Sequence, residues 1–158
     1  MPKDPEEVAL DFSGVRPFEP MNAARNYLCK ATNLTIGKAK ASGLPKTSLE
    51  LTILAPEMTE VVDINGEVQE DPKTGDTKMT RAAGRKLFRE FSLQPDALPF
   101  LYEFIKAVAP DTELGEDFRY KPANYMGLDC AVKINNEEFE EQIRPRVRRI
   151  LPASAYTE

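Results

Sequence analysis

The fold of this chain is constrained most by a series of segments in which apolar and polar side chains alternate. Such alternation is typical of β-strands that bury one face, and it recurs in five segments: residues 27–36, 47–55, 85–92, 128–134 and 141–151. Between the third and fourth segments, apolar side chains recur at three- and four-residue spacing, which predicts an amphipathic helix over residues 96–108. The sequence therefore predicts a mainly β domain with one helix between its third and fourth strands.

A hairpin is predicted as an insertion between the second and third strands, over residues 61–80. Asn65-Gly66 is a strong signal for a two-residue turn, because a type I′ turn needs positive φ at both central positions. A second turn is expected at residues 71–75, and another begins at Asn135-Asn136. Without the insertion, the elements follow the order of a five-stranded OB-fold barrel whose helix closes one end. Other small α+β or β-barrel folds share this order.

One domain is predicted for residues 26–153, with an N-terminal arm over residues 1–25 and a short C-terminal tail over residues 154–158. The arm contains several prolines and little periodicity, and Phe12, Val15 and Phe18 are its candidates for packing on the domain. The alternating segments and the helix predict a set of buried side chains: Leu49, Leu51, Ile53, Leu101, Ile105, Cys130 and Val132.

The absence of histidine excludes nucleophilic systems that use histidine as the base, and it excludes histidine metal ligands. Cys29 and Cys130 lie far apart without CxxC spacing, which predicts buried thiols rather than a disulfide or a zinc site. We expect no cofactor and no metal. No apolar run is long enough for a transmembrane helix, and the N-terminus lacks a secretory signal, so we expect a cytoplasmic protein without a membrane partner.

Positive charge is concentrated in two segments of a chain whose net charge is −5. Residues 71–94 carry six basic and three acidic side chains, and residues 144–158 carry four basic and one acidic. The intervening residues 95–143 carry four basic and eleven acidic side chains. A local excess of positive charge is enough to bind a polyanion even in an acidic protein. The alternative explanation is a solvated surface.

Four segments of the chain resemble a family of small bacteriophage proteins: DFSGVRPFEP (residues 11–20), GRKLFREFSLQPDALPFLYEFIKAV (84–108), YMGLDCAVKI (125–134) and RPRVRRILPA (144–153). Members of this family occur in replication and recombination modules and resemble OB-fold single-stranded-DNA-binding proteins. The resemblance covers most of the chain. It implies a non-catalytic protein of the bacterial host cytoplasm that binds single-stranded DNA, with phage or host replication and recombination proteins and a second copy of itself as candidate partners.

The chain departs from bacterial single-strand-binding proteins in one feature. The chain ends in Ala-Ser-Ala-Tyr-Thr-Glu, without a long acidic tail that carries a hydrophobic tip. We therefore do not expect it to recruit host proteins through such a tail.

Single-strand binding needs a positively charged groove and planar side chains that stack on bases. Lys86 and Phe88 share one face of the third strand, and the arginines of the last strand occupy every second position, so they point the same way. The candidate DNA-binding residues are Tyr27, Lys30, Lys86, Phe88, Arg89, Lys133, Arg144, Arg146 and Arg148. Three cations of the inserted hairpin are candidate flexible-loop contacts: Lys73, Lys78 and Arg81.

These residues also have structural explanations. Phe88 and Phe91 lie on opposite faces of one strand, so one of them belongs to the core, and the pattern does not say which. Tyr27 fits the edge of the core as well as a stacking platform. Alternating arginines also prevent unwanted pairing of an edge strand.

Two other classes of function remain open. In the first, the domain is a protein-interaction module of a phage replication complex, with the acidic residues 95–143 as its contact surface. The second is a carboxylate-metal nuclease, which needs acids that converge from separate strands. No such set stands out, because Glu137-Glu138 and Glu140-Glu141 are adjacent acids of the kind found in solvated turns.

Overall fold

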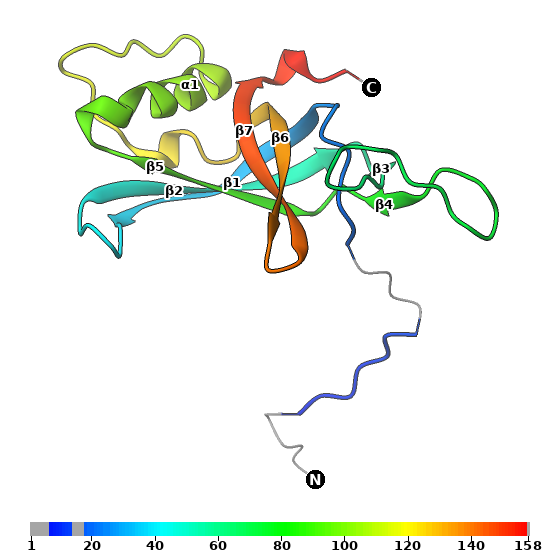
Figure 1. The fold of residues 1–158 in the computed structure, drawn as a ribbon. Helices are drawn as coiled ribbons and strands as arrows, with labels where there is room; N and C mark the ends of the chain where they lie inside the picture. The colour runs from blue at the N-terminus through cyan, green and yellow to red at the C-terminus, as the bar shows by residue number, and fades with distance from the viewer. Residues whose placement is uncertain (1–6, 14–17, 158) are drawn as a thin grey trace.

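The computed structural model describes residues 7–13 and 18–157, and its main element is a five-stranded antiparallel sheet (Figure 1). The strands are β1 (Tyr27–Lys38), β2 (Pro45–Ala55), β5 (Lys86–Ser92), β6 (Asp129–Phe139) and β7 (Gln142–Pro152). They lie in the order β5-β2-β1-β6-β7, and each neighbouring pair is antiparallel. The predicted mainly β class and the five predicted strands are confirmed.

The predicted barrel is not closed, because no ladder joins the edge strands β5 and β7 in the described part of the chain. Pro145 has no N–H to offer a ladder. The pairing of β7 with β6 also slips by one residue next to Arg148, as at a β-bulge. A side chain bridges the edges instead, since Arg89 Nη1 lies 3.3 Å from the carbonyl oxygens of both Val147 and Arg148. We call the boundary between β5 and β7 the seam.

The core lies between the sheet and helix α1 (Leu98–Val108), which follows the 3-10 turn η1 (Pro95–Ala97). All seven side chains that the sequence predicts to be buried are buried: Leu49, Leu51, Ile53, Leu101, Ile105, Cys130 and Val132. The helix packs against β5, β6 and β7. In the part of the chain that the structure describes, no helix has the length and apolar character needed to cross a membrane.

The predicted insertion is present as a two-stranded ribbon of β3 (Met58–Glu60) and β4 (Met79–Arg81). Its first turn differs from the predicted type I′ turn, because Gly66 has a positive φ of 84° and Asn65 does not. Asp63 explains the difference. Its Oδ1 accepts the N–H groups of Asn65 and Glu67 at 2.9 Å each, and its carbonyl oxygen accepts that of Gly66 at 3.0 Å. An aspartate at the first position thus stabilises a turn with a single left-handed residue.

The hairpin between β6 and β7 is longer than the sequence predicts. Strand β6 continues through Asn135-Asn136, where a turn was expected, because the Asn136 side chain donates to the Met21 carbonyl oxygen at 2.7 Å. The chain reverses instead at Glu140 and Glu141, whose φ angles of 49° and 64° are both left-handed. Phe139 pairs with Gln142, so these two glutamates form the whole turn.

Only part of the N-terminal arm packs against the domain. Met21 is buried, Val62 N–H donates to the Pro20 carbonyl oxygen at 3.2 Å, and Phe12 is exposed rather than packed. Phe18 is also largely exposed, although its ring lies under the Arg85 guanidinium. Val15 and Glu158 lie outside the described residues. A 3-10 turn, η2 (Pro122–Asn124), lies between α1 and β6, and another, η3 (Ala153–Ala155), follows β7 near the C-terminus.

Candidate nucleic-acid interface

Strand β5 presents an aromatic side chain to solvent on the face opposite the core. Leu87 and Phe91 are buried, whereas Lys86, Phe88 and Glu90 point outward. The Phe88 side chain is 67% exposed and that of Phe91 is 2% exposed, so the choice that the sequence left open is settled: Phe91 is the core residue. Phe91 lies 5.9 Å from Phe104 of α1, ring to ring. Phe88 is thus free to stack on a planar ligand.

Four of the candidate DNA-binding residues come together at the seam. An open cleft of about 580 Å³ is lined by β5 on one side and β7 on the other: Phe88, Arg89, Glu90, Arg146, Val147 and Arg148. It contains three guanidinium groups and one carboxylate. Because the sheet is open, the cleft lies where a closed barrel would have backbone hydrogen bonds.

Arg89 differs from the other arginines of the cleft because it is half-buried and already bonded. Its guanidinium lies 5.1 Å from the Phe91 ring centroid and 5.7 Å from that of Phe100, besides its contacts with the β7 carbonyls. Burial lowers the pKa of Arg89 from its ordinary value, but the group remains charged at neutral pH. Its main role is therefore to hold the seam, with its charge added to the cleft.

The predicted arginine stripe is present on β7. Arg144, Arg146 and Arg148 are exposed, and they alternate with the half-buried Pro145 and Val147. Arg146 Nη1 lies 3.3 Å from Glu137 Oε2. Such an exposed ion pair is weak and exchangeable, so Arg146 remains available to a phosphate. Arg144 lies outside the lining of the cleft, with its guanidinium 5.3 Å from the Phe139 ring centroid.

Phe139 is an exposed aromatic residue that the sequence interpretation missed as a site residue. It is 56% exposed at the end of β6. The turn predicted at Asn135-Asn136 ended the predicted strand before Phe139, so Phe139 was not considered as a strand residue. The signal that would have found it is the continued alternation of outward polar side chains through Lys133 and Glu137.

Tyr27 is not a stacking platform, which corrects the prediction. Its side chain is fully buried, and its hydroxyl donates to the Asn22 carbonyl oxygen. Burial raises the pKa of Tyr27 to about 12, against a weaker opposing hydrogen bond with Thr59. A ring enclosed on all sides cannot stack on a base.

The remaining candidate lysines lie on the sheet but outside the cleft. Lys30 of β1, Thr52 of β2 and Lys86 of β5 are direct neighbours in one row across three strands. Lys86 Nζ lies 3.1 Å from Thr52 Oγ1 and 3.4 Å from Glu50 Oε2. Lys133 is exposed on β6, opposite Arg149. None of these three lysines lines the seam, and Lys133 lines a different pocket together with Arg25 and Glu60.

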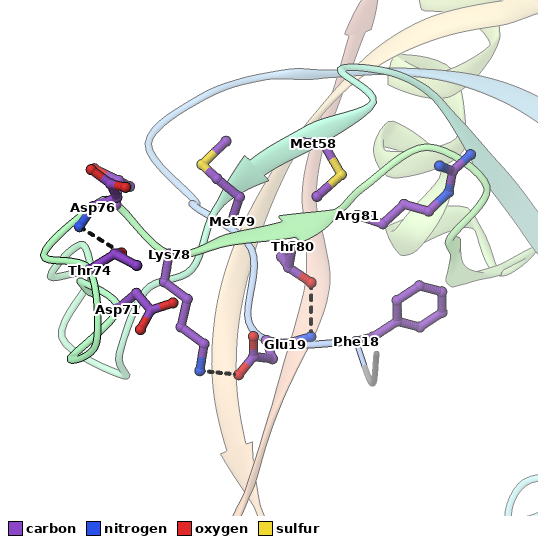
Figure 2. A pocket seen from close by; sticks show the side chains of 11 residues that line it. Phe18, Glu19, Met58, Asp71, Thr74, Asp76, Lys78, Met79, Thr80 and Arg81 are labelled. Atoms are coloured by element: carbon purple, nitrogen blue, oxygen red, sulfur yellow. Dashed lines mark hydrogen bonds and ion pairs between the residues drawn. The ribbon is translucent and has the colours of Figure 1, made fainter. Parts of the chain in front are cut away.

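Two of the three cations predicted on the insertion, Lys78 and Arg81, face a different pocket, of about 840 Å³ (Figure 2). Lys78 forms an ion pair with Glu19, and Arg81 Nη1 lies 3.6 Å from Glu57 Oε1. Asp71 and Asp76 also line this pocket. The structure therefore gives these cations acidic neighbours and does not bring them to the seam. Lys73 is exposed on the turn nearby.

Both cysteines are buried and free, as predicted. Burial raises the pKa of Cys130 to about 12 and also raises that of Cys29. Within residues 7–13 and 18–157, no group of three or more acidic or cysteine side chains lies close enough together to hold a metal ion.

Comparison with known proteins adds no relative to these observations. The sequence matches no protein-family model, and a comparison with curated proteins finds no match. A functional interpretation therefore has to start from the seam itself.

Proposed function

We propose that the protein binds single-stranded DNA without catalysis, in the replication or recombination of phage DNA. The five-stranded sheet is then a partly open OB-type barrel. The strand order β5-β2-β1-β6-β7 and the place of α1 between the third and fourth of these strands along the chain support this proposal.

One observation carries the proposal: the exposed Phe88 ring shares the seam with Arg146 and Arg148. An exposed aromatic ring does not stabilise the fold by burial in the core, whereas stacking on a base contributes roughly 1–3 kcal/mol to binding. The two guanidinium groups on β7 supply charge to neutralise phosphates beside that base. Both requirements for single-strand binding are met within one cleft.

The same chemistry predicts the preferred form of DNA. In a duplex, the faces of the bases are covered by their neighbours, so Phe88 has nothing to stack on and only the phosphates are available. We therefore expect a clear preference for single strands and little discrimination among sequences, since every base has a planar face.

Fluorescence anisotropy with labelled oligothymidine and a duplex of equal length tests the proposal. Phe88→Ala should lower the affinity for the single strand by about 5- to 140-fold, with the salt dependence nearly unchanged. Tyr102→Ala is the matched control, because Tyr102 is an exposed aromatic residue on α1 that does not line the seam. Equal affinity for both forms of DNA at the same salt concentration would refute the proposal.

A further inference from the structure

The β6–β7 hairpin ends in an acidic tip that carries an exposed aromatic ring. The tip consists of five consecutive residues, all of them exposed: Glu137, Glu138, Phe139, Glu140 and Glu141. The ladder between β6 and β7 runs without interruption from Asn135 to Phe139, and it holds the tip away from the rest of the sheet (Figure 1).

This tip is poorly suited to its own turn. Glu140 and Glu141 have φ angles of 49° and 64°, in a region that favours glycine and asparagine. Their carboxylates also add to those of the neighbouring glutamates, and like charges repel. Within the hairpin, Glu137 pairs with Arg146 and the Phe139 ring lies against Arg144. Neither the turn geometry nor the charge of the other three glutamates helps the hairpin to fold, so a contact outside the fold better explains their presence.

The charge of the tip is also opposite to that of a DNA-binding loop. In OB-fold barrels the loop between the last two strands is one of those that bind oligonucleotides. Here that loop carries four carboxylates, which repel phosphate. The tip instead has the chemistry of the ligand: Phe139 offers a planar ring like a base, and the glutamates offer negative charge like phosphates.

The seam is the complementary surface on the same chain. It combines the exposed Phe88 ring with the guanidinium groups of Arg146 and Arg148 in one open cleft. Guanidinium groups bind carboxylates in a bidentate manner, and aromatic rings pack favourably edge to face or offset. We propose that the tip of one copy of this protein docks in the seam of a second copy.

The Phe139 ring has to reach the seam of another copy rather than its own. Glu137, at the base of the tip, already contacts Arg146 of the same copy at 3.3 Å. Phe139 pairs with Gln142 at the far end of the ladder that joins Asn135 to Arg146, so its ring would have to break that ladder to reach its own Phe88. Docking uses different surfaces on the two copies, and such a heterologous contact adds copies in a row. The inference shares the seam with the proposed function but does not depend on DNA binding.

Sedimentation velocity of the full chain at low salt, over a range of protein concentrations, tests the docking. The wild-type protein should associate as its concentration rises, and high salt should reverse the association. The variant Glu140→Asn/Glu141→Gly removes two charges and at the same time introduces the favoured type I′ sequence, so its hairpin keeps its fold. It should weaken association by at least about tenfold, as should Phe139→Ala.

A matched control removes two exposed carboxylates elsewhere. Glu113→Gln/Glu116→Gln changes the acidic residues between α1 and β6 and should associate like the wild type. Tip variants that associate as strongly as this control would overturn the proposal. A wild-type protein that stays monomeric at low salt and high concentration would overturn it as well.

A mixing experiment identifies the seam as the partner surface. The seam variant Phe88→Ala/Arg148→Glu, which keeps the Arg146–Glu137 ion pair of the hairpin, should be monomeric alone, and so should the tip variant. Mixed in equal amounts, they should form dimers and nothing larger, because only one of the two possible contacts is intact. Absence of dimers in the mixture would show that the tip binds elsewhere and would refute the pairing.

Binding of oligothymidine distinguishes the docking proposal from the proposed function. Protein that associates but does not bind oligothymidine supports the docking and refutes the proposed function. Protein that binds oligothymidine but never associates refutes the docking alone. If both hold, short oligothymidine should dissociate the complexes, because it competes with the tip for one cleft.

Discussion

Replacing Arg146 and Arg148 together by alanine should change the salt dependence of DNA binding by a calculable amount. Both guanidinium groups line the seam, and both side chains are exposed. Each phosphate contact on a single strand contributes about 0.7 to the slope of log affinity against log salt concentration, so the double variant should have a slope shallower by about 1.4. Over a fourfold increase in salt concentration, it should lose about sevenfold less affinity than the wild type.

The measurement is an anisotropy titration with oligothymidine at four or so salt concentrations, on folded protein. Folding should survive, because exposed ion pairs such as Arg146–Glu137 contribute less than about 1 kcal/mol. Arg119→Ala/Lys121→Ala is the control, since these exposed cations between α1 and β6 do not line the seam. If the double variant and this control have the same slope as the wild type, the phosphates do not follow the seam, and the reasoning is refuted.

The remaining predictions concern stability, measured by urea denaturation. Arg89→Ala should lower the free energy of unfolding by about 2 kcal/mol, because its contacts with the two β7 carbonyls are charge-assisted and half-buried; an unchanged midpoint would show that the seam does not depend on it. Asp63→Ala should cost about 1 kcal/mol without changing DNA binding, because its side chain accepts two backbone N–H groups of the turn. Tyr27 and Cys130 have pKa values raised to about 12 from 10.0 and 9.0, so their contribution to stability should be fully present below about pH 8 and should be lost as the pH rises from there towards 12, where only the unfolded state loses these protons. A stability that rises over that range would contradict the burial of both groups.

The sequence predicts the strands and the core well because both follow from local alternation. The alternation in the sequence matches the burial in the structure for Leu49, Leu51 and Ile53, since a strand with one buried face repeats every two residues. The limits of the last hairpin were harder to predict. Asn136 has the composition of a turn residue, but its side chain is tied to Met21, far away in the sequence.

The candidate site depends on contacts between distant segments of the chain, which no local sequence pattern predicts. Alternation places Phe88 and Phe91 on opposite faces of β5, but only the position of α1 decides which face is buried, through the contact between Phe91 and Phe104. Likewise, the sequence around Tyr27 is compatible with an exposed ring, but the residues that enclose the ring come from distant segments of the chain. The approach of β5 to β7 brings Phe88 beside Arg146, although more than fifty residues separate them in the chain.

The seam has a mechanical consequence for the domain. Strand β1 pairs with β6 only over Tyr27–Lys30, whereas it pairs with β2 along most of its length. The sheet is thus two ribbons, β5-β2-β1 and β6-β7, which are joined by a short ladder at one side, by the Arg89 side chain at the other, and by α1, which packs against strands of both. Because the ladder between the ribbons is short, side chains rather than backbone hydrogen bonds set the width of the seam. If the proposed single-strand binding holds, a width set in this way should admit purines and pyrimidines alike.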